Sequence, residues 1–254
     1  MNRKDDWIAV FDSGVGGISV LRHLVKQLPG ERFVYFGDSA NAPYGTRSRE
    51  EVEKLTFSVV KALLPRGLKA LVVACNTATS AAIDSLRSAY PDLIIVGIEP
   101  ALKLAVDHFP GGRIGVMATT MTLAEEKFSH LMARYRRDAQ IYKLPAPGLV
   151  ELVEAGAGNS PQAEALLRDL LAPCLGKLDA VVLGCTHYPF AAQALTRVLG
   201  PEVALLDGGE GTARETCRRL EQADLLRQGA GEIILENSSK DPMLIALSQA
   251  LLNS

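Results

Sequence analysis

The sequence has 254 residues, of which 48% are hydrophobic and 22% are charged, a composition typical of a folded globular protein. Its 27 basic and 29 acidic residues leave a formal net charge of −2, so we expect no general attraction to nucleic acid or to anionic lipid. No apolar run approaches the roughly 18 residues that a membrane-spanning helix needs.

The N-terminus and the cysteines predict a cytoplasmic protein. Charged residues continue to Asp6, and the apolar stretch Trp7–Phe11 is too short for the hydrophobic part of a signal peptide. The chain has too few cysteines for a disulfide scaffold, and we expect reduced thiols at Cys75, Cys174, Cys185 and Cys217. Because no Cys-x-x-Cys pair or His cluster offers metal-ligand spacing, no metal is predicted.

In chain order, short apolar runs alternate with longer segments of helical periodicity. The runs predict buried strands at Ile8–Phe11, Phe33–Phe36, Leu71–Ala74, Ile94–Ile98, Ile114–Met117, Val181–Leu183 and Val203–Leu206. Helices are predicted at Gly17–Gln27, Ser48–Leu64, Thr79–Ala89, Thr122–Arg136, Pro161–Leu171 and Gly211–Gln222. This alternation predicts an α/β fold of parallel strands flanked by helices, with ligands at the carboxyl ends of the strands.

Two cysteine segments 110 residues apart indicate an internal duplication. "ALVVACNTATSAA" (70–82) and "AVVLGCTHYPFAA" (180–192) share one cysteine, one valine and three alanines at matching positions. In each segment an apolar run is followed by a cysteine and then by polar residues. We therefore predict two pseudosymmetric lobes, each a mostly parallel sheet flanked by helices. The active site would lie in the cleft between them, with one thiol on each wall.

A pair of opposed thiols suits proton transfer at a stereocentre. A redox dithiol would need Cys-x-x-Cys, and a Cys–His nucleophile would use Cys185 and His187 but leave Cys75 unexplained. To invert a carbon that bears one hydrogen, a base removes the proton from one face and an acid returns a proton to the other. Free cysteine has a pKa of about 8.5, so a thiol can act in both roles, and we expect both cysteines at helix N-termini, which favour the thiolate.

Polar residues near the two cysteines are candidates for tuning the thiols or relaying protons. Asp12 and His187 are the first choices, and Glu154 is a third, with Glu151 as a competitor on the same helix. A structural interpretation stays open for Asp12, which could merely cap the helix that follows it. The glycines of "GVGG" do not complete a dinucleotide-binding fingerprint.

At these motifs the sequence resembles the glutamate racemases of the cofactor-independent aspartate/glutamate racemase superfamily. "FDSGVGG", "GDSANAPYG", "CNTAT", "GCTHYP" and "DGGEGTA" occur in the order typical of that family and span nearly the whole chain. The resemblance implies an isomerase that supplies D-glutamate for peptidoglycan without pyridoxal phosphate or metal. It implies that Cys75 acts on the D-enantiomer and Cys185 on the L-enantiomer, with Asp12, Glu154 and His187 as auxiliary residues.

The resemblance also implies the substrate-binding residues. These are Asp12, Ser13, Pro43, Tyr44, Gly45, Asn76, Thr77, Thr186 and His187. The segment "GVMATTMTLAEEKF" departs from the family pattern at Ala118 and Phe128, and its candidate contacts are Thr119, Thr120 and Thr122.

The family implies a discontinuous first lobe. We expect residues 1–98 plus 206–254 to carry Asp12 and Cys75, and residues 99–205 to carry Glu154, Cys185 and His187. A homodimer is expected, with glutamate as the small-molecule substrate and with no nucleic-acid or membrane partner. Two alternatives stay open: a related racemase acting on aspartate or a hydantoin, and a non-catalytic two-lobed amino-acid-binding protein.

Overall fold

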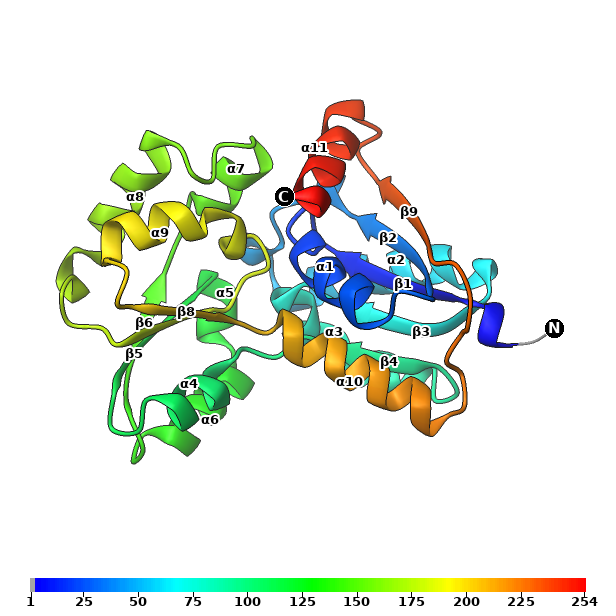
Figure 1. The fold of residues 1–254 in the computed structure, drawn as a ribbon, viewed down its shortest axis with the longest axis horizontal. Coiled ribbons are helices and arrows are strands. Elements are labelled where there is room, and N and C mark those ends of the chain that lie inside the picture. The colour runs from blue at the N-terminus through cyan, green and yellow to red at the C-terminus, as the bar shows by residue number, and fades with distance from the viewer. Residues whose placement is uncertain (1–2) are drawn as a thin grey trace. The chain divides into compact units, whose positions relative to one another are not determined.

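The computed structural model describes residues 3–254, and of Lys127 only the backbone. Met1 and Asn2, which open the N-terminus predicted to lack a signal peptide, lie outside the described residues. The chain divides into two compact units, one formed by the segment up to Glu99 with Gly209–Ser254 and the other by Pro100–Gly208 (Figure 1). The division predicted from the sequence placed Glu99 in the second unit and residues 206–208 in the first.

The first unit is built on a five-stranded parallel sheet. Its strands, in spatial order, are β4 (Ile94–Gly97), β3 (Leu68–Val73), β1 (Trp7–Asp12), β2 (Arg32–Gly37) and β9 (Glu232–Asn237). Every residue of β3 is buried, as is expected for a central strand covered on both faces.

Helices cover both faces of this sheet. They are α1 (Ile18–Gln27), α2 (Arg49–Leu63), α3 (Asn76–Ala89), α10 (Gly209–Gln222) and α11 (Pro242–Asn253), with 3₁₀ turns η1 (Arg3–Asp5), η2 (Ser39–Asn41), η3 (Tyr44–Thr46) and η4 (Leu64–Arg66). Helix α1 packs against α10 and α11, and α2 packs against α3. Figure 1 shows α1 and α10 in front of the sheet, with α2 and α3 behind it.

The second unit repeats this plan with a four-stranded parallel sheet. Its strands, in spatial order, are β6 (Gln140–Pro145), β5 (Arg113–Ala118), β7 (Ala180–Leu183) and β8 (Ala204–Asp207). Its helices are α4 (Leu102–His108), α5 (Thr120–Ala124), α6 (Glu126–Tyr135), α7 (Leu149–Glu154), α8 (Pro161–Leu171) and α9 (Ala192–Leu199), with turns η5 (Ala172–Cys174) and η6 (Tyr188–Ala191).

Successive side chains of the central strands of the second unit point alternately into two hydrophobic cores. Met117 and Leu183 belong to a core that includes side chains of α7, α8 and α9. Val116 and Val182, one residue earlier in each strand, belong to a second core with side chains of α4 and α6. Because successive side chains of a strand point to opposite faces, this sheet is covered by helices on both faces.

The two sheets share one strand order, which agrees with the predicted duplication. The order β4-β3-β1-β2 in the first unit corresponds to β8-β7-β5-β6 in the second. Ile8 pairs with Ala70 in the first sheet, and Ile114 pairs with Ala180 at the equivalent place in the second. The predicted α/β class with two parallel sheets flanked by helices is confirmed.

Every predicted strand is present, but the predicted helix Thr122–Arg136 is wrong. The backbone of Glu125 is extended and separates α5 from α6. The predicted start of the third helix at Thr79 is also wrong, because Cys75 already caps α3. Strands β6 and β9 were not predicted, because they are edge strands whose residues are mostly half-buried or exposed.

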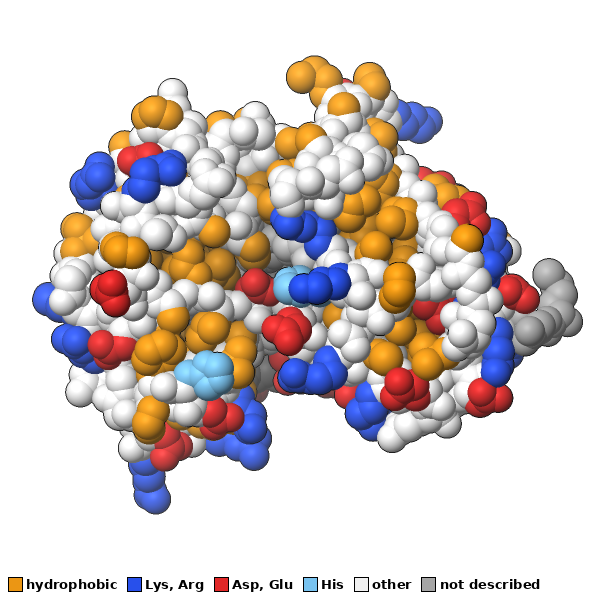
Figure 2. Space-filling view, viewed as in Figure 1, with side chains coloured by type: hydrophobic (Ala, Val, Ile, Leu, Met, Phe, Trp, Pro, Cys, Tyr) orange, Lys and Arg blue, Asp and Glu red, His pale blue; other side chains and the backbone are white. Residues whose placement is uncertain are grey.

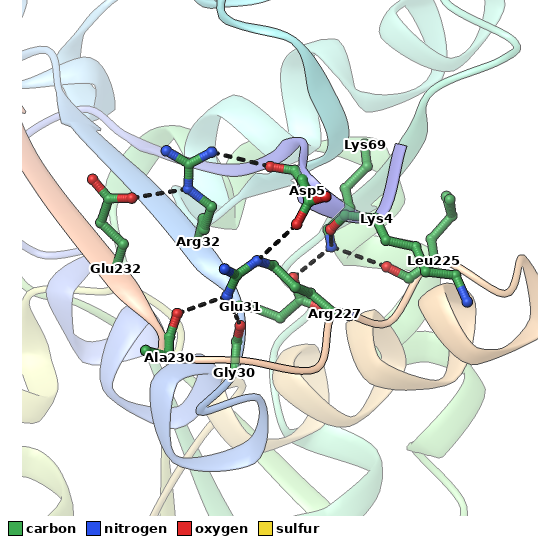
Figure 3. A network of polar contacts seen from close by, with 10 residues as sticks. All are labelled: Lys4, Asp5, Gly30, Glu31, Arg32, Lys69, Leu225, Arg227, Ala230 and Glu232. Carbon is green, nitrogen blue, oxygen red and sulfur yellow. Dashed lines mark hydrogen bonds and ion pairs between the residues drawn. The ribbon is translucent and has the colours of Figure 1, made fainter. Parts of the chain in front are cut away.

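A buried ion pair fixes the amino ends of β2 and β3 (Figure 3). The side chains of Lys69 and Glu31 are 0% and 1% exposed, and Lys69 Nζ lies 2.5 Å from Glu31 Oε2. Lys69 Nζ also donates to the carbonyls of Lys4 (2.6 Å) and Leu225 (2.9 Å), while the backbone N–H of Arg227 donates to Glu31 Oε1 (2.8 Å). These contacts attach the segment between α10 and β9 to the first sheet.

The surface carries side chains of both charges (Figure 2). Figure 2 shows acidic and basic side chains interspersed on the face in view. Within residues 3–254, no helix is both long and apolar enough to cross a membrane.

Candidate active site

Asp12 ends the central strand of the first unit and is fully buried. Its Oδ1 accepts a hydrogen bond from Gly14 N at 3.0 Å, and the N-cap of α1 is Gly17. Asp12 is therefore not the N-cap of this helix. A Cβ at Gly17 would lie 2.5 Å from Asp12 Cβ, closer than packed atoms approach, so glycine is required where the turn passes the aspartate.

Cys75 follows β3 and is the N-cap of α3, so its predicted place at a helix N-terminus is confirmed. Its Sγ accepts from Ala78 N at 3.4 Å, lies 3.5 Å from Ser13 Oγ, and is buried with the residue 4% exposed. The positive end of the helix macrodipole favours a thiolate at this position.

Asn76, the first residue of α3, has a buried side chain whose hydrogen-bonding groups are unused. The residue is 6% exposed, and neither its Nδ2 nor its Oδ1 has a hydrogen-bond partner among the described residues. An unsatisfied buried polar group costs about 1–3 kcal/mol, so a bound ligand with both donors and acceptors would stabilise this amide.

Tyr44 lies in the segment between β2 and α2, between Pro43 and Gly45, and is 1% exposed. Its hydroxyl donates to Asp38 Oδ2 at 2.7 Å. Burial and then this contact with Asp38 raise the pKa of the Tyr44 phenol far above its ordinary value, with smaller contributions from Cys75 and Asp12. The phenol therefore stays protonated and acts as a hydrogen-bond donor.

Asp38 was not predicted as a candidate residue from the sequence. The sequence feature that could have identified it is a carboxylate directly after a predicted buried strand, in "GDSANAPYG". The residue is 2% exposed and directly follows β2, one position beyond Gly37, which pairs with Asp12 at the end of β1.

In the second unit, Cys185, His187 and Glu154 form one chain of contacts. Cys185 Sγ lies 3.7 Å from His187 Nδ1, and His187 Nε2 lies 2.6 Å from Glu154 Oε1. The imidazole is nearly fully buried, and the Glu154 side chain is 18% exposed. A carboxylate on Nε2 orients the ring and leaves Nδ1 facing the thiol, an arrangement suited to proton relay.

Glu154, rather than Glu151, is the carboxylate that meets this histidine. Glu154 is the last residue of α7, whereas Glu151 lies one turn earlier and is exposed. The adjacent Tyr188 is fully buried, and burial, followed by the neighbouring Cys185 and Glu151, raises the pKa of its phenol well above the ordinary value.

The prediction that Cys185 also occupies a helix N-terminus is wrong. After β7 ends at Leu183 the chain turns, η6 begins only at Tyr188 and α9 only at Ala192. The carbonyl of Cys185 accepts from Tyr188 N at 3.1 Å within this turn. The polar influence on this thiol is therefore the His187 imidazole and not a helix macrodipole.

The off-pattern segment after β5 is explained locally by capping and core packing. Thr119 is the N-cap of α5, and its Oγ1 accepts from Thr122 N at 3.2 Å. Thr120 is exposed, while Ala118 and Phe128 are core residues. Contacts of the three threonines with a ligand stay a prediction.

The remaining candidates follow the cysteines directly. Thr77 and Thr186 are both buried. Of the other cysteines, Cys174 is buried in η5, and Cys217 donates to Glu221 within α10. Among residues 3–254, no group of three or more His, Cys, Asp or Glu side chains is arranged to hold a metal ion.

Comparison with known proteins decides the family. The Asp/Glu/hydantoin racemase family matches residues 8–216, well over half of the chain. The chain belongs to this racemase family. It is 50% identical over 256 residues to the glutamate racemase of Clostridium acetobutylicum, with both chains fully covered.

Solved structures extend the similarity to the fold. A glutamate racemase isoform from Bacillus anthracis superimposes with a TM-score of 0.89 at 30% identity, covering 99% of this chain and 95% of that one. The Escherichia coli glutamate racemase, solved in complex with L-glutamate and an activator, gives a TM-score of 0.87 at 32% identity, with 97% and 95% coverage. The predicted resemblance is confirmed, and the chain is an isomerase of this racemase fold.

Proposed function

We propose that this protein interconverts L- and D-glutamate by proton transfer at Cα, with Cys75 and Cys185 as the two acid/base groups. The supporting observation is that equivalent strands, β3 and β7, each lead into a thiol with polar neighbours. Membership of the racemase family and 50% identity to a glutamate racemase support the reaction and its substrate.

In the L-to-D direction, the Cys185 thiolate takes the proton from Cα. The Cα–H bond breaks, an S–H bond forms, and the electron pair stays on the substrate carbon and its carboxylate. The Cys75 thiol then donates its proton to the other face of Cα, which leaves Cys75 as the thiolate that begins the reverse reaction. The proposal requires a conformation in which both thiols reach one Cα.

The neighbours of each thiol have different tasks. On the Cys185 side, His187 exchanges a proton with the thiol through Nδ1, and Glu154 stabilises the imidazolium that forms (Nε2–Oε1 2.6 Å). On the Cys75 side, the N-terminus of α3 stabilises the thiolate, and Ser13 is its hydroxyl partner.

The substrate would be held mainly by neutral donors. The unsatisfied amide of Asn76 offers both a donor and an acceptor to an α-amino acid, and the first backbone N–H groups of α3 favour a carboxylate. Ser13, Pro43, Tyr44, Gly45, Thr77, Thr119, Thr120, Thr122, Thr186, His187 and Asp12 complete the proposed binding set. The mechanism uses no metal or pyridoxal phosphate.

Isotope exchange tests the proton-transfer mechanism. L-Glutamate is incubated with the enzyme in heavy water, and the product is separated by chiral chromatography. We expect one deuterium at Cα of the D-glutamate, because the proton that is returned comes from a thiol in exchange with solvent. D-Glutamate formed without deuterium would rule out this mechanism.

Substitution of each cysteine tests the roles. Cys75→Ala and Cys185→Ala should each lower kcat by at least about 10³-fold, since each removes one of the two acid/base groups. Cys217→Ser, outside the proposed site, is the matched control and should keep wild-type turnover. Undiminished racemisation by either alanine variant would remove that cysteine from the mechanism.

Substrate profiling separates glutamate from the alternatives in this family. We expect racemisation of glutamate to exceed that of aspartate and of hydantoins. We further infer a cytoplasmic homodimer that supplies D-glutamate for peptidoglycan. Light scattering tests the dimer, and D-glutamate dependence of a strain that lacks the gene tests the supply role.

A further inference from the structure

The segment that leads from β2 to α2 contains a buried carboxylate with contacts on three sides. Asp38 is 2% exposed, and its Oδ2 accepts from the Tyr44 hydroxyl at 2.7 Å. Asn41 Nδ2 lies 3.1 Å from both carboxylate oxygens. The backbone N–H of Asp38 donates to the carbonyl of Asp12 at 2.9 Å, so one residue joins the end of β1, η2 and η3.

Among the described residues, no cation forms an ion pair with the Asp38 carboxylate. Arg47 donates its Nε to the carbonyl of Asn41 at 2.9 Å. The side-chain donors that Asp38 receives are an amide and a phenol, both neutral. Burying a carboxylate costs free energy unless hydrogen bonds compensate for the lost water. The shortest hydrogen bond to Asp38 comes from Tyr44, and this bond holds the two side chains in a fixed geometry.

Tyr44 connects this carboxylate to the proposed reaction site. Its ring lies against Phe11, with centroids 6.3 Å apart, and η3 contacts α3, the helix that Cys75 caps. The charges of Cys75 and Asp12 both act on its phenol. A shift of Tyr44 would therefore alter the surroundings of the Cys75 thiol.

We propose that Asp38 is a positioning residue that fixes Tyr44, and with it residues 43–45, against Cys75. The inference rests on the proposed function, in which this segment binds substrate. Asp38 acts through Tyr44 and makes no contact with the reacting atoms. Its removal should weaken substrate binding and expose Cys75 while leaving Cys185 unaffected.

A double-mutant cycle tests this role. Asp38→Asn, Tyr44→Phe and the double variant are compared for kcat and KM. We expect each single variant to raise KM about 10-fold, the loss of one charge-assisted hydrogen bond, with a smaller change in kcat. The double variant should resemble Tyr44→Phe, because Asp38 then has no phenol to hold.

Ser39→Ala is the matched control. Ser39 lies in the same segment, and its Oγ accepts from Asn237 Nδ2 at 2.9 Å, so this variant removes a hydrogen bond of the segment without touching Tyr44. A KM increase in Ser39→Ala equal to that in Asp38→Asn would overturn the proposal. Additive effects in the double variant would also overturn it.

A second readout does not depend on glutamate being the substrate. Iodoacetamide alkylation of Cys75 is followed by peptide mass spectrometry, with Cys185 as the internal reference. Asp38→Asn should speed alkylation of Cys75 at least about 5-fold relative to Cys185, and Ser39→Ala should not. If the wild type fails to racemise glutamate but this response is present, the proposed function fails and the positioning role stands. Unchanged alkylation of Cys75 in Asp38→Asn contradicts the positioning role.

Discussion

Replacing Lys69 with methionine should destabilise the first unit strongly, because it removes the cation of a buried pair. Lys69 Nζ contacts Glu31 Oε2 and donates to the carbonyls of Lys4 and Leu225. In the variant, Glu31 stays buried and keeps the hydrogen bond from the N–H of Arg227. Removal of one partner of a buried ion pair costs about 3–5 kcal/mol, and we expect about 4 kcal/mol here.

Urea unfolding measures this loss. Trp7 is the single tryptophan of the chain and begins β1, so its fluorescence reports on the unit that holds the pair. Replacing both Lys69 and Glu31 with methionine should recover at least half of the lost free energy of unfolding, because no buried charge is left unpaired. Lys103→Met, which breaks a pair whose lysine side chain is 74% exposed, is the control and should cost less than about 0.5 kcal/mol.

A Lys69→Met variant whose free energy of unfolding lies within about 1 kcal/mol of the wild type, about one quarter of the expected effect, would contradict this cost of an unpaired Glu31. A double variant less stable than Lys69→Met alone would contradict it as well.

Three other substitutions test the proposed site and the structure that supports it. Glu154→Gln should lower kcat/KM about 10²-fold by removing the carboxylate that orients the relay imidazole, whereas Glu151→Gln should leave steady-state racemisation unchanged. Gly17→Ala forces a Cβ to within 2.5 Å of the aspartate that ends β1 and should reduce activity, while Gly211→Ala, with open space around its Cβ, should not. Ser48→Ala removes the capping box of α2 and should cost about 1 kcal/mol in a urea titration, with turnover per folded molecule retained.

Much of the fold follows from local sequence pattern. Continuous apolar runs such as Leu71–Ala74 predict central strands correctly, because a strand covered on both faces is mostly apolar. The duplicated segments around Cys75 and Cys185 predict the equivalence of β3 and β7, which the common strand order agrees with. The motifs at the strand ends identify the family.

Other features depend on tertiary structure. The edge strand β9 has only a short apolar run, Ile233–Leu235, between Glu232 and Glu236. Its pairing with β2 forms when the C-terminal segment returns to the first sheet. The sequence alone left Glu154 and Glu151 as competitors and gave no role to Asp38, because hydrogen-bond partners are chosen by three-dimensional proximity. Periodicity reports which residues are buried, since burial follows the local repeat of a helix or strand. Which buried groups meet is decided by segments that lie far apart in the chain, and no local pattern encodes that.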